Sequence, residues 1–372
     1  MFIQAYNWYF DFAIQSLTIR KPALSHINNF DFLRLFFALA VLVTHSYPLI
    51  GMREEDLLFQ FSHGQASLSH TGVQGFLIIS GFLIAKSLFR SQGLLDYYYK
   101  RALRVFPGLW AMLGITLIVC FFFSGKTLLG YLTHYSTRDY AIYNALLKTQ
   151  YIIDGVFSNN PYPDAVNGSL WTIPYEFFFY IVLSVCFFIR THTRLLRWVF
   201  AGLFIGLASL YLTATPSLKA FQLPFWPLQG QHLAELGAFF ISGAIWALVP
   251  MPTVKIRRLL ALVAAVAWVT SLLLGGYSYV QFVALPVLVI SFGTLNTPML
   301  SWVRNYGDFS YGIYLYGFFV QQTLMALFQL SLLELMTASI VVTYGCGALS
   351  WHLIEKQALR FKLRMQPSSP SL

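Results

Sequence analysis

The sequence predicts an all-α polytopic membrane protein with about ten transmembrane helices and both termini in the cytoplasm. Of its 372 residues, 57% are hydrophobic and only 10% are charged, and the mean hydropathy is +0.63. Average charged content in proteins is roughly 25%, so a water-soluble fold is excluded. Apolar runs of about 18 residues or more recur along the chain, which is the length that crosses a bilayer as a helix.

Each expected span is one such run between polar or basic segments. The first 28 residues lack the pattern of a cleavable signal peptide, because Asp11, Arg20 and Lys21 interrupt them. We therefore expect a cytoplasmic segment over 1–28, a transmembrane domain over 29–356 and a cytoplasmic tail over 357–372. The expected spans are 31–50, 71–90, 106–124, 170–189, 198–214, 232–249, 259–275, 279–296, 309–329 and 335–355.

The basic residues orient these spans. Five of the 24 lysines and arginines fall in loops on one side, one lies within the first span, and the other 18 fall on the opposite side. Positive residues remain in the cytoplasm, so this split predicts a multi-pass protein of the inner or plasma membrane, with the lipid bilayer as its partner. The distribution of lysines and arginines also explains the net charge of +10. We therefore exclude nucleic-acid binding.

Two ionisable residues lie inside the first apolar run. Arg34 and His45 are eleven residues apart, close to three helical turns, so their side chains leave the same face about 16 Å apart along the axis. Ionisable groups in lipid are costly and usually functional. This stripe is consistent with an acid–base site near the outer surface. It is also consistent with the path of a proton-coupled transporter or exporter of a glycan or an acidic small molecule.

Glu176 is a candidate partner for His45. Counted from the span edges, both residues lie about 8–9 Å below the outer surface. A carboxylate at that depth would fix the imidazole tautomer and leave the other nitrogen free to take a proton from a hydroxyl. The alternatives are a structural pair between helices, or two residues that never meet.

On the inner side, Arg101 and Arg104 precede the third span and share one helical face with i, i+3 spacing. With Arg34 they form a candidate site for a phosphorylated ligand, although basic residues at this level also serve as topology signals or lipid contacts. A donor with a phosphorylated head and a long thioester arm, such as acyl-CoA, would connect these arginines with His45.

Other residues carry weaker signals. His63, His70 and His134 fall in expected outer loops, where solvated histidines are usual, and no ligand spacing predicts a metal site. Ser80 and Gly81 form a small pair that permits close helix packing or lines a path. Cys120, Cys186 and Cys346 are expected to pack as small buried hydrophobic residues. Asp308, just before the ninth span, is expected to cap that helix.

Several segments, taken in order, resemble membrane acyltransferase family 3, which includes polysaccharide and lipopolysaccharide O-acetylases. The segments are the run from Asn29 through Arg34 to His45, then 72–84, Arg101-Ala-Leu-Arg104 with Pro107, Asn167-Gly-Ser-Leu-Trp171 with Glu176 and Tyr180, and 309–315. The resemblance covers about residues 29–362.

The resemblance implies O-acyl transfer, most often of acetyl, from cytoplasmic acyl-CoA (acetyl-CoA) to a hydroxyl of an extracytoplasmic or cell-surface glycan. The acceptor would be a lipopolysaccharide, an exopolysaccharide or a lipid-linked sugar. It implies that His45 is the catalytic base or acyl relay and that Arg34, Arg101 and Arg104 bind the donor. Direct transfer and an acyl-histidine route both remain open. This chain departs from many relatives at Gln74, where they carry an acid, and near Gly317, where they carry a histidine.

Overall fold

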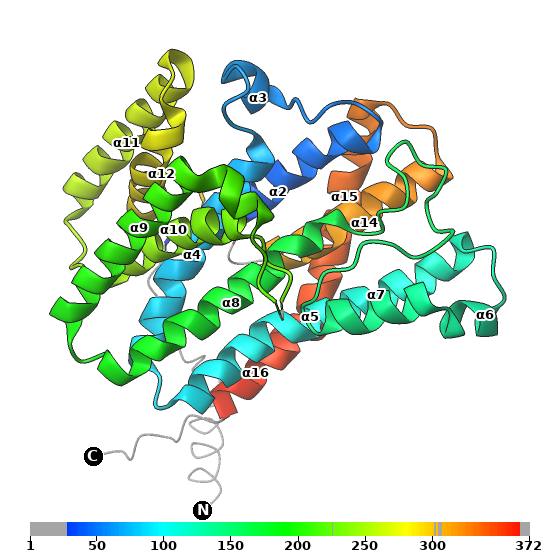
Figure 1. Ribbon diagram of the computed structural model, residues 1–372, viewed down its shortest axis with the longest axis horizontal. Coiled ribbons are helices and arrows are strands. Elements are labelled where there is room, and N and C mark those ends of the chain that lie inside the picture. The colour runs from blue at the N-terminus through cyan, green and yellow to red at the C-terminus, as the bar shows by residue number, and fades with distance from the viewer. Residues whose placement is uncertain (1–27, 225, 301–302, 304–306, 365–372) are drawn as a thin grey trace, which may run out of the picture.

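The chain folds into helices that run through most of the described residues in the computed structural model, which describes residues 28–224, 226–300, 303 and 307–364 (Figure 1). Within those ranges there is no β-strand, only isolated bridges. The long helices are α2 (Phe30–Leu49), α4 (Leu68–Arg90), α5 (Leu94–Phe123), α8 (Thr172–Ser184), α9 (Thr193–Ala220), α10 (Gly230–Ala247), α11 (Val254–Leu274), α12 (Tyr277–Gly293), α14 (Ser310–Leu327) and α15 (Leu332–Ser350).

Shorter helical elements extend or connect these. The turn η1 (Gly168–Trp171) precedes α8 and η2 (Val185–Ile189) follows it, while η3 (Trp351–Glu355) and α16 (Lys356–Arg364) continue α15. The expected outer loops fold into α3 (Leu57–Phe61), α6 (Leu128–Thr133) and α7 (Tyr135–Ala145). The predicted cytoplasmic segment 1–28 lies outside the described residues except for residue 28. The predicted tail 357–372 is described only as far as residue 364.

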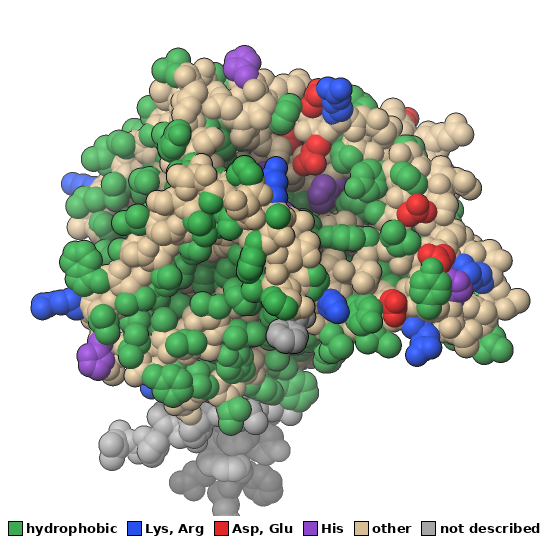
Figure 2. Space-filling model, viewed as in Figure 1, with side chains coloured by type: hydrophobic (Ala, Val, Ile, Leu, Met, Phe, Trp, Pro, Cys, Tyr) green, Lys and Arg blue, Asp and Glu red, His purple; other side chains and the backbone are tan. Residues whose placement is uncertain are grey.

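Membrane character is clear from the helices themselves. In the described part of the chain, seven helical segments are long and apolar enough to cross a bilayer. The expected spans at α10, α12 and α14 are helices, but they are shorter or more polar than those seven. The predicted count of ten and the cytoplasmic placement of both termini therefore stay predictions. Figure 2 shows hydrophobic side chains over much of one face, as a lipid-facing surface requires.

Helix α4 lies at the centre of the bundle. In its most apolar stretch 72% of the residues are buried, against 11% for α9 and 17% for α11, whose large apolar side chains are exposed. Gly81 of α4 and Gly243 of α10 let the two backbones touch, because a Cβ on either would collide with a carbonyl oxygen of the other helix. This close contact fixes the position of α4 in the bundle. One face of α4 forms a wall of the candidate site described below.

Candidate active site

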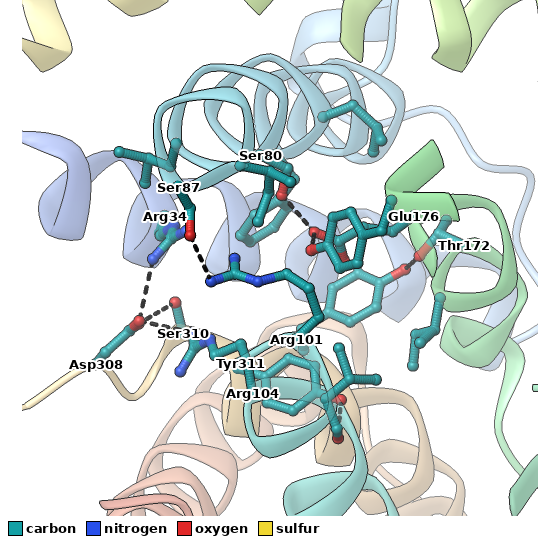
Figure 3. A pocket seen from close by; sticks show the side chains of 18 of the residues that line it. Arg34, Ser80, Ser87, Arg101, Arg104, Thr172, Glu176, Asp308, Ser310 and Tyr311 are labelled. Atoms are coloured by element: carbon teal, nitrogen blue, oxygen red, sulfur yellow. Dashed lines mark hydrogen bonds and ion pairs between the residues drawn. The ribbon is translucent and has the colours of Figure 1, made fainter. Parts of the chain in front are cut away.

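A cavity of about 380 Å³ lies among α2, α4, α5, α8 and α14 (Figure 3). Along α4 its lining recurs every three or four residues from Val73 to Ser87, which corresponds to about 21 Å of helix. The polar and charged lining residues are Arg34, Ser80, Ser87, Lys100, Arg101, Arg104, Thr172, Glu176, Tyr180, Asp308, Ser310, Tyr311 and Tyr314.

Two of the predicted arginines share one carboxylate. Asp308, which precedes α14, lies 3.2 Å from an Arg34 nitrogen and 2.6 Å from an Arg104 nitrogen. It also accepts a hydrogen bond from the Ser310 hydroxyl. The expected helix cap is not found, because Phe309 is the N-cap residue of α14 and no side chain caps that helix. Burial opposes ionisation of Asp308, but the Arg104 and Arg34 cations lower its pKa to about 2. The carboxylate therefore holds both guanidinium groups in place at neutral pH.

Arg101 is placed differently. It is 8% exposed, and one of its terminal nitrogens donates to the Ser87 hydroxyl at 3.3 Å. Its Nε has no hydrogen-bond partner, and no carboxylate pairs with it among the described residues. Figure 3 shows its guanidinium extending across the cavity. A buried cation with unused donors is suited to an anionic ligand.

Glu176 faces this cavity, but the predicted pairing with His45 is not found. Its Oε1 accepts hydrogen bonds from the Ser80 hydroxyl and from Tyr180 Oη, the latter at 2.5 Å. His45 is close to another part of α4, since the neighbouring Thr44 hydroxyl accepts from the Ser69 backbone N–H at 3.0 Å. Ser69 and Ser80 are eleven residues apart, or about 16 Å along the helix, so the two side chains lie at different depths.

His45 does not line the cavity. Its half-buried ring packs edge-on against Phe318, with centroids 5.3 Å apart. The lining residues Phe76 and Tyr314, whose ring centroids are 5.8 Å apart, lie at the outer end of the cavity, and Phe318 is one turn beyond Tyr314. The structure thus brings the three arginines and Glu176 to one cavity and places His45 beyond its outer end.

A second imidazole lies at the level of His45. His70 was expected to be a solvated loop residue, but it belongs to the first turn of α4, and its Nε2 lies 2.5 Å from Glu235 Oε1. Glu235 is fully buried, and its other oxygen has no hydrogen-bond partner in the described structure. His70 precedes the lining residue Val73 by three residues, so it continues the spacing of three or four residues that the cavity lining follows along α4. This helical spacing is the sequence signal that could have pointed to His70.

The two departures from the resembling family have structural explanations. Gln74 donates to Glu235 at 3.0 Å and to the Gln281 side-chain oxygen at 2.9 Å, so Glu235 supplies a carboxylate beside the position where an acid was missing. A Cβ on Gly317 would lie 2.8 Å from Leu42 Cδ1, so a side chain at this position would require the end of the Leu42 side chain to move. The cysteines are unpaired, and no cluster of three metal-ligating side chains occurs in the described ranges.

Comparison with known proteins agrees with the motifs. The sequence profile of a family described as "Acyltransferase domain" matches residues 27–352. The chain is similar to an "O-acetyl transferase" of Shigella phage Sf6, with 31% identity over 91% of this chain and 97% of that protein. It is also similar to "Nodulation protein 10" of Rhizobium leguminosarum bv. viciae, with 29% identity over 91% of this chain and 94% of that protein. No solved structure matches it.

The profile match extends over most of the chain, from before α2 to within η3, and it includes every element that contributes to the cavity except α16. Membrane-spanning helices, a buried cationic cavity and this match lead to the same identification. The chain belongs to membrane acyltransferase family 3 and is an acyltransferase.

Proposed function

We propose that the protein transfers an acyl group, most simply acetyl, from cytoplasmic acyl-CoA to a hydroxyl of an extracytoplasmic or cell-surface glycan. The observation that carries this proposal is the cavity of about 380 Å³ that has arginines at one end and extends about 21 Å along α4. The phosphates of the donor bind at its arginine end, and the thin pantetheine arm follows α4 outward. We place the enzyme in the inner or plasma membrane.

The three arginines have different tasks in this proposal. Arg101 binds donor phosphate directly, because its guanidinium has unused donors and no carboxylate partner in the described structure. Arg34 and Arg104 are held by Asp308 and contribute positive potential at the same end. Glu176, fixed by Ser80 and Tyr180, contacts the arm of the donor part-way along the cavity instead of orienting His45.

In the reaction, the hydroxyl oxygen of the glycan attacks the thioester carbonyl carbon, and the carbon–sulfur bond breaks. His45 takes the hydroxyl proton and returns a proton to the departing thiolate, so that CoA leaves as its thiol. In the two-step alternative, an imidazole nitrogen takes the acyl group first and the glycan hydroxyl then accepts it. Either route requires the thioester to reach beyond the cavity lining to the level of His45, which does not line the cavity.

The test uses purified protein in liposomes, radiolabelled acetyl-CoA and envelope polysaccharide from a strain that lacks the gene. Label should appear on the polysaccharide with wild type and fall by about 10²-fold or more with His45→Gln. His70→Gln is the matched control, because His70 lies at the same level on α4. Loss with His70→Gln but not with His45→Gln would move the base to His70. Movement of polysaccharide without label would reject acyl transfer.

A further inference from the structure

A second cavity, of about 320 Å³, lies on the other side of α8 from the arginines. Three parts of the chain form it, namely residues 147–151, the start of α8, and residues 222, 226–229 and 232. Its aromatic lining residues are Tyr151, Trp171, Tyr175 and Trp226, and its polar ones are Thr149, Gln222, Gln229 and His232. We refer to these eight residues as the aromatic pocket.

We infer that the aromatic pocket binds a sugar ring of the acceptor glycan. This inference rests on the proposed function, since it names the place where that function takes its acceptor. The weakly positive C–H face of a pyranose packs on the negative face of an aromatic ring, and its hydroxyls need hydrogen-bond partners around the edge. The aromatic pocket offers both kinds of surface.

The charge of the lining favours a neutral ligand. The aromatic pocket contains no lysine, arginine, aspartate or glutamate, whereas the cavity across α8 contains Arg34, Lys100, Arg101 and Arg104. A phosphorylated molecule is therefore suited to the first cavity and an uncharged polyhydroxylated one to the second. A bare hydrocarbon chain would leave the polar side chains of the aromatic pocket without partners.

One polar atom of the aromatic pocket is already buried without a partner. His232 packs between Trp171 and Tyr175, with ring centroids 4.7 and 5.9 Å away, and its Nδ1 has no hydrogen-bond partner in the described structure. Tyr175 is less available, since its hydroxyl accepts from the Gln229 backbone N–H at 2.8 Å. A buried nitrogen without a partner is costly, and a sugar hydroxyl would satisfy it.

The aromatic pocket is also close to the imidazoles at the outer level. Trp171 ends η1, and Gly168 begins it against Phe318, the ring that touches His45. Three residues of this turn advance by about 6 Å, so η1 connects the aromatic pocket with the environment of His45. Thr172 and Glu176, which follow in α8, face the donor cavity instead. The start of α8 therefore separates the two cavities.

The experiment measures binding and transfer separately. Binding of delipidated envelope polysaccharide, from a strain lacking the gene, is followed by microscale thermophoresis without acetyl-CoA, and labelled acetyl transfer is followed on the same preparations. The variants are Trp171→Leu, His232→Gln and Gln222→Ala, the last at an exposed position where folding is not at risk. Trp198→Leu is the matched control, because Trp198 is 74% exposed and lies outside the aromatic pocket.

We expect Trp171→Leu to weaken polysaccharide binding by about tenfold, with smaller losses for the other two variants. Binding of acetyl-CoA, and its slow hydrolysis by water, should stay at wild-type levels in all of them. If the wild type binds polysaccharide without transferring acetyl, and Trp171→Leu loses that binding, the aromatic pocket is supported while acetyl transfer is rejected. Unchanged polysaccharide binding in folded Trp171→Leu and Gln222→Ala, or binding lost equally in Trp198→Leu, would overturn the inference.

Discussion

At the residue scale, Arg101 differs from the other two arginines of the cavity because no carboxylate pairs with it among the described residues. Replacing it removes donors for the ligand without leaving a charge unpaired. We therefore expect Arg101→Ala to raise the Kd for acetyl-CoA by about 10–100-fold, the size of one or two charge-assisted hydrogen bonds, with little change in thermal stability. Arg101→Lys should recover part of the loss, since it keeps the charge but not the planar fork.

Binding of radiolabelled acetyl-CoA to purified protein measures this effect. Arg258→Ala is the matched control, because Arg258 is exposed on α11 and does not line the cavity. A Kd for Arg101→Ala within twofold of wild type would exclude Arg101 from the donor site.

Asp308 should matter for stability as well as for binding. Asp308→Asn leaves Arg34 and Arg104 without their shared carboxylate, which should cost on the order of 1–3 kcal/mol and lower the thermal midpoint by several degrees. The folded-state pKa of about 2 lies below the usual 3.8, so this stabilisation is fully present above pH 4 and is lost only as the pH falls through about 2. Thermal melts should therefore show the same difference from wild type at pH 5 and pH 8. A difference that shrinks between those two values would contradict the assignment.

Individual site residues could be predicted from sequence better than their pairings. The three arginines line one cavity, as expected of a shared site, whereas Glu176 lies in that same cavity and not beside His45 as predicted. The pairing of Glu176 with His45 depended on depths counted from span edges, and the register between α8, α4 and α2 does not follow those edges. The pairing of His70 was not predicted, because its partner Glu235 lies 165 residues away in sequence.

At the element scale, the crossing of α4 and α10 should be intolerant of any side chain. A Cβ on Gly81 would meet the Phe240 carbonyl, and one on Gly243 would meet the Ile78 carbonyl, so backbone would have to move. We expect Gly81→Ala or Gly243→Ala to destabilise the protein by about 1–3 kcal/mol and to reduce transfer, because α4 carries one wall of the arginine-lined cavity.

Thermal unfolding in detergent, followed by size-exclusion chromatography, measures this prediction. Gly114→Ala on α5 and Gly202→Ala on α9 are the matched controls, since a Cβ at either position meets nothing within 4 Å. Equal stability of Gly81→Ala and Gly114→Ala would contradict the prediction, because it would mean that α4 and α10 have room for a Cβ at Gly81.

The positions of most long helices followed from sequence, because they are apolar runs with the length of a bilayer, whereas α10, α12 and α14 are shorter or more polar. Helices α3, α6 and α7 were not predicted, since these short helices in expected outer loops depend on local contacts. Asp56, for example, caps α3 through the Leu58 and Phe59 amides and also accepts from the Thr44 hydroxyl at 2.5 Å. Helix packing follows from close contacts such as Gly81 with Phe240, and an apolar pattern alone does not contain that information.

At the scale of the whole molecule, the arrangement separates two chemistries. Cationic side chains gather at one end of the bundle, where Lys100 and Arg101 lie in the N-terminal part of α5. Aromatic rings and neutral polar groups gather at the start of α8, and His45 and His70 lie near that level. Helices α4 and α8 both extend between the two regions. Under the proposed function, a donor and an acceptor from different compartments would then meet within one protein.

This arrangement requires α10, α12 and α14 to cross the bilayer, although they are shorter or more polar than the seven clear spans. Polar groups on two of them form hydrogen bonds inside the protein: Glu235 Oε1 of α10 with His70 and Gln74, and the Gln321 amide nitrogen of α14 with the Leu42 carbonyl and Ser46. Internal hydrogen bonds of this kind permit a polar helix to span lipid. We therefore expect alternating sides for the segments that flank these three helices.

Single cysteines placed at exposed positions test the crossings with a membrane-impermeant maleimide. Cysteine in place of Lys219, Ser278 or Gln329 should react in intact cells, whereas cysteine in place of Lys255 or Asn296 should react only after permeabilisation. The protein without introduced cysteines is the background control, because Cys186 and Cys346 are partly exposed. Labelling of Lys219→Cys and Lys255→Cys from the same side would mean that α10 does not cross. The helices after α10 would then be inverted, Asp308 before α14 could not lie on the same side as Arg34 and Arg104, and the proposed donor site would fail.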